Sequence, residues 1–244
     1  MKGAIRPIML LAPLLAGCAS TGAPATRGAG SADQGISATA SPKLDGQVTR
    51  EASPEGEAVA RQFLGNRSGG AWKLGTGYQW VTAGRLYWVM GPLDPARLVA
   101  VLEDGRPSVL LSGDIPALKD FLAKQFNGRL PGVAALNGIA QLVKDAIIGK
   151  GGSIASPEFF ESQRRDLDAW LKGRERDPAE LRKVCSGIRG SLNKNEWAVE
   201  FNVINAGGGV DVVRASGTAS PLTLLHISVG VVKARGAFRY PLEG

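Results

Sequence analysis

The stretch that decides the fold reads WAVEFNVINAGGGVDVVRA and runs from Trp197 to Ala215. Two segments rich in strand-forming residues, 197–204 and 210–215, stand on either side of three consecutive glycines. Glycine adopts turn conformations without steric cost, so residues 207–209 predict a connection between two neighbouring strands. Two further strands are predicted downstream, at Leu222–Val232 and Gly236–Tyr240, and together the four strands make an antiparallel meander.

A second block of strands is predicted nearer the N-terminus. Between Trp72 and Trp80 large side chains alternate with small or polar ones, which is the period-two pattern of a strand. Asp104-Gly105 is a strong hairpin signal between two of the strands that follow. The predicted strands of this block are 72–80, 85–90, 98–102 and 107–112.

Three helix starts share one pattern, in which a capping side chain precedes a proline at the first helical position. They are Ser53-Pro54, Ser156-Pro157 and Asp177-Pro178. The third helix is predicted to continue to Leu192, because apolar residues recur at helical spacing up to that point. Two more helices are predicted at 116–126 and 131–148. The second of these is apolar nearly all round, which favours burial over membrane contact.

The order of these elements predicts the α+β class. Two antiparallel four-stranded meanders flank a central group of helices, with short connections between neighbouring strands. A helix followed by a meander occurs twice, which predicts two similar halves at about 54–127 and 155–244. Whether the strands form one sheet or two stays open at this stage.

The first residues of the chain have the composition of a secretion signal. Lys2 and Arg6 precede the apolar run Ile8–Ala16, as in the charged and apolar regions of a signal peptide. A membrane-spanning helix needs roughly 20 apolar residues, so this run is too short to be a stable anchor. We therefore expect residues 1–17 to be a removed signal peptide.

The run ends in Leu15-Ala16-Gly17-Cys18, which resembles the lipobox of bacterial lipoproteins. In that family the cysteine thiol receives a diacylglycerol and the signal is cut just before it, so the resemblance implies that Cys18 is the lipidated first residue of the mature protein. Two or more acyl chains, such as palmitate, anchor a protein firmly to a bilayer. The alternative is an ordinary cleaved signal with a chance cysteine.

The residues after Cys18 predict a tether and an address. The segment 18–53 has few large apolar residues and no aromatic one, so it cannot bury enough surface to fold. We expect it to hold a globular domain, 54–244, away from the membrane. Ala19 and Ser20 resemble the residues that direct lipoproteins to the outer membrane, facing the periplasm; the alternative is the plasma membrane.

The formal net charge of +7 and the pI of about 9.6 point to acidic partners. Lys and Arg outnumber Asp and Glu between Gln163 and Lys194. This excess predicts contact with an acidic envelope polymer or an envelope protein, and the alternative is a solvated pair of helices. The secretion signal removes the chain from nucleic acid, which we exclude as a partner.

Catalytic and cofactor motifs are largely missing from the sequence. With one histidine and no CxxC, the chain lacks the common zinc motifs, and it has no GxSxG, phosphate loop or dinucleotide loop. Ser191 to Lys194 matches the SxxK motif of penicillin-recognising enzymes, but the companion motifs are missing. We predict no metal, no cofactor and no assigned catalytic residue.

Three groups of residues carry the remaining catalytic alternatives. His226 shares a predicted strand face with Ser228, although a triad also needs a carboxylate. Glu158 and Glu161 lie three apart on a predicted helix and could act as an acid pair, or could simply favour the helix N-terminus. Cys185 lies on an apolar helix stripe, where a buried thiol is inert.

Aromatic residues supply the candidate ligand site. Trp72, Tyr78, Trp80 and Trp88 would form a concave aromatic face if the first sheet curls, and would be core if that face meets the helices. The sequence as a whole predicts a membrane-anchored envelope lipoprotein that is a non-catalytic binding or assembly protein. The alternatives are a hydrolase of cell wall or lipid with an unfamiliar site, and a carrier of small ligands.

Overall fold

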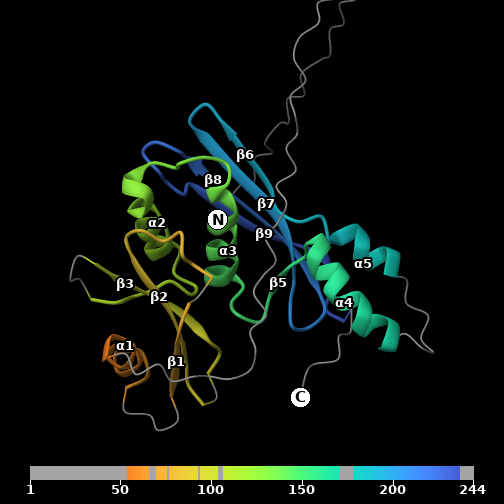
Figure 1. Ribbon diagram of the computed structural model, residues 1–244, viewed down its shortest axis with the longest axis horizontal. Helices are drawn as coiled ribbons and strands as arrows, with labels where there is room; N and C mark the ends of the chain where they lie inside the picture. The colour runs from red at the N-terminus through yellow and green to blue at the C-terminus, as the bar shows by residue number, and fades with distance from the viewer. Residues whose placement is uncertain are drawn as a thin grey trace, which may run out of the picture. The chain divides into compact units, whose positions relative to one another are not determined.

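The computed structural model describes residues 54–65, 70–75, 77–92, 94–103, 107–170 and 178–236. The predicted signal peptide, Cys18 and the tether to residue 53 lie outside these residues. So do Asp104-Gly105 and all of the predicted strand Gly236–Tyr240 except Gly236. The described part has helices and two antiparallel sheets, which confirms the α+β class (Figure 1).

The first sheet is a simple meander of four antiparallel strands in the order β1-β2-β3-β4. Helix α1 (Pro54–Leu64) packs on one face of this sheet, where Val59 and Leu64 meet Trp72, Tyr87 and Val89. The opposite face joins the main core. The strands are β1 (Ala71–Leu74), β2 (Gly84–Met90), β3 (Arg97–Leu102) and β4 (Val109–Leu110).

The second sheet has five described strands, and two of them, β5 and β6, do not belong to the predicted meander. Its central strand is β7, which pairs with β8 on one side and with both β5 and β6 on the other. Strand β5 comes from the segment just before Pro157 and pairs with the end of β7. The strands are β5 (Ser153–Ile154), β6 (Arg189–Asn193), β7 (Glu196–Ile204), β8 (Val210–Thr218) and β9 (His226–Lys233).

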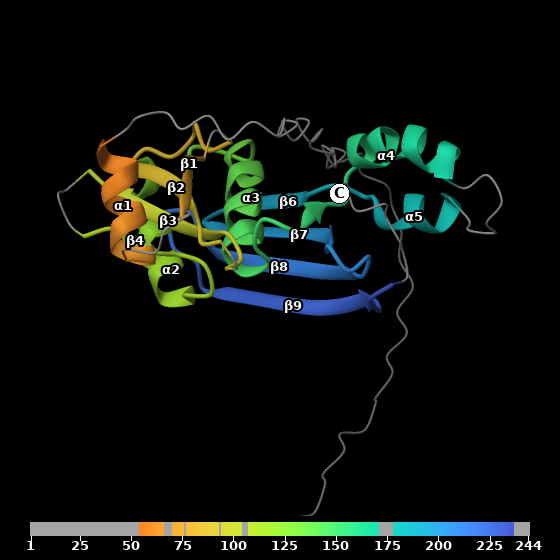
Figure 2. The same cartoon turned by 90° about the horizontal axis from the view of Figure 1, so that it is seen from below.

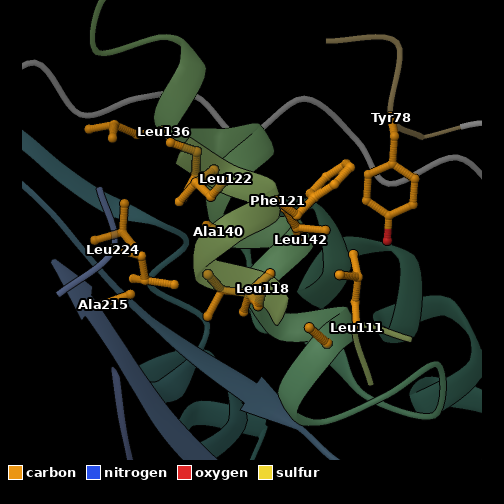
Figure 3. Close-up of a cluster of buried hydrophobic side chains, with 14 of the residues drawn as sticks. Tyr78, Leu111, Leu118, Phe121, Leu122, Leu136, Ala140, Leu142, Ala215 and Leu224 are labelled. Atoms are coloured by element: carbon orange, nitrogen blue, oxygen red, sulfur yellow. The ribbon is translucent and has the colours of Figure 1, made fainter. Parts of the chain in front are cut away.

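The central helices fill the space between the two sheets (Figure 2). They are α2 (Ile115–Ala123), the 3-10 helix η1 (Gln125–Gly128) and α3 (Ala135–Ile147). Helix α3 contacts β3 of the first sheet and both β7 and β8 of the second. Figure 3 shows Leu118 and Phe121 of α2 among the residues of this core, with Leu136 and Ala140 of α3. The predicted burial of this apolar helix is confirmed.

Two helices lie at one end of the second sheet. They are α4 (Pro157–Trp170) and α5 (Pro178–Val184). Phe160 and Leu181 from these helices pack with Ile204 and Val210, at the ends of β7 and β8 that meet in the glycine turn. All three helices with a predicted proline start do begin at that proline, and the Ser156 hydroxyl accepts a hydrogen bond from the Phe159 amide as the predicted cap.

The prediction of a long third helix is wrong. Helix α5 ends at Val184, and Gly187 adopts a left-handed conformation with φ of 75°. The chain then enters β6, where Gly190 and Leu192 face inward more than their neighbours. Residues four apart share a face on a helix and also on a strand. The apolar residues at 184, 188 and 192 therefore fitted a helix even though the chain forms a strand from residue 189.

Candidate functional site

Cys185 is structural. It follows α5 and is 5% exposed, in a cluster with Phe160, Leu181 and Val184. Burial raises the pKa of this thiol to about 12, so it stays protonated at neutral pH. A thiol that stays protonated is a poor nucleophile. The geometry therefore agrees with the inert alternative for this residue.

The SxxK pair does not converge. Ser191 is exposed on β6, and Lys194 lies in the turn that follows, with φ of 53°. Residues three apart share a face on a helix, but on a strand they point to opposite faces. A lysine in this position cannot activate the serine as the motif requires, so we assign no reaction to the pair.

The four aromatic residues do not form one shared face, and that premise of the predicted ligand site is wrong. The strand predicted over 72–80 is only four residues long, and β1 ends at Leu74. Trp72 packs under α1, whereas Tyr78 and Trp88 belong to the main core on the other side of the sheet. Trp80 is half-buried and stacks on Phe126, with ring centres 5.6 Å apart. Ligand binding by this group stays a prediction.

The two glutamates, Glu158 and Glu161, occupy the start of α4. Glu158 lies in the first turn, where a carboxylate favours the positive end of the helix. Its Oε2 atom is covered and makes no hydrogen bond within the described part of the chain. Glu161 is exposed. The position agrees with the electrostatic alternative.

His226 is the first residue of β9 and is exposed. Its strand partner on β8 is Ser216, and Ser228 follows on the same face. The carboxylate on this face, Glu200, bonds Arg189 and Arg214 instead. Ser228 and His226 therefore share a face as predicted, but no bonded Ser-His-carboxylate chain forms among the described residues.

His226 belongs to a broad open surface of the second sheet. Strand register places Ser191, Ala198, Ser216 and His226 in one row across four strands. Arg189, Glu200, Arg214 and Ser228 form the next row. These side chains are exposed or half-buried. We call this surface the outer face; its members are Arg189, Ser191, Ala198, Glu200, Arg214, Ser216, His226 and Ser228.

The outer face carries a small charge network. Glu200 accepts hydrogen bonds from Arg189 through one oxygen and from Arg214 through the other, the second at 2.5 Å. The side chains of Arg189 and Arg214 are 65% and 57% exposed, so their ion pairs contribute little to stability. Two guanidinium groups around one carboxylate leave one positive charge in excess. Their remaining N–H donors are suited to a carboxylate or phosphate.

Helices α4 and α5 limit the outer face at one end. The Asn202 side chain, in the row after Glu200, donates a hydrogen bond to the Val184 carbonyl at 2.8 Å. Beyond it Ile204 and Val210 are buried under the two helices. The same side of the sheet thus has a polar part, whose side chains are exposed or half-buried, and an apolar part that is buried.

A buried polar cluster that the sequence did not predict lies on α3. Asp145 and Lys144 are 3% and 5% exposed and form an ion pair. The Tyr78 hydroxyl and the Gln141 amide both donate to Asp145, the latter at 2.8 Å, and Lys144 donates to the Gly152 carbonyl at 2.9 Å. Burial, and then the Asp145 carboxylate, raise the pKa of the Tyr78 hydroxyl far above its usual value. The cluster joins α3 to the connection between β1 and β2, through Tyr78, and to the segment before β5, through Gly152.

Two broader findings concern only the described residues. No group of three or more His, Cys, Asp or Glu side chains is arranged there to hold a metal ion. None of the helices there has both the length and the apolar character needed to cross a bilayer.

Comparison with known proteins found no matching family model, no matching curated protein and no matching solved structure.

Proposed function

We propose that this chain is a lipid-anchored protein of the bacterial envelope, held at the outer membrane through Cys18, and that it binds a partner rather than catalysing a reaction. The observation that carries the binding role is the outer face, an exposed surface built from four paired strands. Its small side chains, Ser191, Ala198, Ser216 and Ser228, allow a second surface to approach closely. Small-ligand sites are usually concave and mostly apolar, so an exposed polar surface of this kind suits a macromolecule better than a small ligand.

The chemistry of the outer face favours an acidic partner. Arg189 and Arg214 have one carboxylate between them, so a partner carboxylate could take up their free donors. Electrostatic complementarity of this kind steers association and selects partners. We therefore propose an acidic surface on another envelope protein as the partner.

Photo-crosslinking in intact cells tests the binding role. A photoreactive residue at Ser228, on the outer face, is expected to give a discrete protein adduct. The matched control is Arg61 on α1, the helix that packs on the first sheet. Its side chain is 76% exposed. The same residue at Arg61 should give no such adduct. Equal adducts at both sites, or none at Ser228, would contradict the proposal.

A charge reversal tests the acidic nature of the partner. Arg214→Glu in the Ser228 crosslinking variant is expected to reduce the adduct about tenfold, because it places two carboxylates where the partner's acid would bind. Arg61→Glu, also on an exposed helix position, should leave the yield unchanged. If the adduct is instead a heterogeneous polymer that resists protease, the partner is an acidic envelope polymer and not a protein, and the proposed partner is wrong.

The anchor is tested separately from the binding face. Cells given a fatty-acid analogue should label the native protein, and the Cys18→Ala variant should lose essentially all of the label and leave the membrane fraction. The physical reason is that each buried methylene contributes about 0.8 kcal/mol to membrane binding, which the variant lacks entirely. Label that persists on the variant would exclude this cysteine as the lipidation site.

A further inference from the structure

Two lysines approach each other where the C-terminal end of α3 meets the first sheet. Lys73 lies on β1, on the same face of the strand as Ala71, whose partner on β2 is Met90. Lys150 follows α3, and its Nζ atom lies 3.8 Å from the Sδ atom of Met90. Both lysines are half-buried. Their ammonium groups therefore belong to one partly covered region beside Met90.

The charges of these two lysines are not compensated within the described part of the chain. Neither of them forms an ion pair with a carboxylate there, and the acceptor for Lys150 is a thioether sulfur, which is a weak acceptor. Burial, and then the positive charge of Lys73, lower the pKa of Lys150. Both effects mean that the protein as it stands disfavours the charged form of this side chain.

Lys144 shows how the same end of α3 treats a lysine that has a partner. Its ammonium group pairs with Asp145 and donates to the Gly152 carbonyl at 2.9 Å. That charge is neutralised within the protein. The excess positive charge of this region therefore belongs to Lys73 and Lys150, and an anion from outside the chain would relieve it.

The loop that contains Lys150 adds backbone donors to the two ammonium groups. Residues 149–152 read GKGG, and Lys150 and Gly151 form a turn. The Gly152 amide donates to the Gly149 carbonyl at 3.5 Å. The amides of Lys150 and Gly151 have no acceptor among the described residues, and Gly151 is exposed. Backbone N–H groups of successive residues bind the anion in many phosphate sites.

We propose that Lys73, Lys150 and the backbone amides of residues 150 and 151 form a binding site for a terminal phosphate group. Such a group has three or more oxygen acceptors around one centre, which is enough for two ammonium groups and two amides, whereas a carboxylate has two. Its charge-assisted hydrogen bonds would replace the weak thioether contact of Lys150. This inference does not depend on the proposed function, which concerns the second sheet.

Titration of the purified full-length protein with inorganic phosphate tests the site. With the ionic strength kept constant by sodium chloride, phosphate should shift the amide NMR signals of residues 150 and 151 until they saturate. Lys73→Gln and Lys150→Gln should each weaken this binding about tenfold, because each variant loses one charge-assisted hydrogen bond. Lys194→Gln removes the same charge from an exposed position after β6 and should leave the affinity unchanged.

Two of these measurements decide against the proposal. Shifts that do not saturate, or that saturate equally in the native protein and in both glutamine variants, would overturn it and would mean that the two ammonium groups stay hydrated. Lys150→Arg keeps the positive charge and its donors, so it should bind phosphate within about threefold of the native affinity. If Lys150→Gln does not fold, Lys73→Gln still tests the site, because it changes a different element.

The same titration identifies the source of the phosphate group. Glycerol 3-phosphate represents a soluble ester, and dihexanoyl phosphatidic acid represents a lipid headgroup in a form that needs no vesicle. Binding of the lipid at least about tenfold tighter than glycerol 3-phosphate would assign the site to a lipid headgroup, and equal or weaker binding would assign it to a soluble phosphate. Failure of all three probes to bind would overturn the proposal.

Discussion

Replacing Asp145 by alanine is expected to lower the free energy of unfolding by about 3–5 kcal/mol, as found when one partner of a buried ion pair is removed. The Lys144 ammonium, 5% exposed, would lose its counter-ion. The hydroxyl of Tyr78 and the amide of Gln141 would lose their acceptor at the same time. Three buried or half-buried polar groups would thus be left with fewer partners by one substitution.

Chemical denaturation at neutral pH measures this effect against two comparisons. Asp120→Ala is the control, because that carboxylate is exposed on α2, and its loss should change the stability by no more than about 0.5 kcal/mol. Asp145→Asn retains an oxygen that can accept from Tyr78, so it should fall between the other two variants. A loss below about 1 kcal/mol for Asp145→Ala would mean that water or a rearranged Lys144 side chain replaces the carboxylate.

This polar cluster also marks a limit of prediction from sequence. Lys144 and Asp145 are adjacent in a helix whose other residues are mostly apolar, and the sequence pattern correctly predicted that the helix is buried. Nothing in the local pattern reveals that Tyr78, 67 residues away, supplies the hydroxyl that bonds Asp145. Long-range partners of this kind follow from packing, which one sequence does not specify.

The elements themselves were predictable where local chemistry determines them. Proline is the first residue of α1, α4 and α5, and the Ser156 hydroxyl caps α4, so local signals that act within one turn predicted these starts. The end of α5 was not predictable from spacing, since Ile188 and Leu192 fit a helix stripe and a strand face equally well. The prediction of a strand from Trp72 to Trp80 was also wrong, because the alternating pattern continues past Leu74 although the strand does not. The chain turns at 77–80, where the Tyr78 hydroxyl bonds Asp145 of α3.

The outer face was predictable only in part. The alternation of β9 places His226 and Ser228 on one face, and the sequence analysis reached that result. The bonding of Arg189 and Arg214 to the same carboxylate depends on the register of three strands. A shift of one residue in any strand would move its side chains to the opposite face. Register follows from the hairpin turns and the buried face together, and neither is determined by the polar residues that form the site.

The second large effect is expected at Gly217, in the last part of β8. The Trp197 side chain lies across from this glycine, and its indole N–H donates to the carbonyls of Thr218 and Thr223 at 3.0 Å each. This bond holds the 219–224 loop against the strand. A methyl group added at Gly217 would lie 1.8 Å from the same Thr223 carbonyl oxygen. The loop could relieve this overlap only by moving away from the indole.

Gly217→Ala is therefore expected to lower the free energy of unfolding by about 3 kcal/mol, at the upper end of the range for overpacking, because backbone must move and not a flexible side chain. Leu222 and Leu224, which are both buried in the core, would move with the loop. Gly230→Ala in the neighbouring strand is the matched control. Its new methyl group would meet only Val212 Cγ1 at 3.4 Å, so it should change the stability by less than about 0.5 kcal/mol. Equal losses for the two alanine variants in denaturant unfolding would show that strand flexibility, and not the close approach of the loop, determines the need for glycine at position 217.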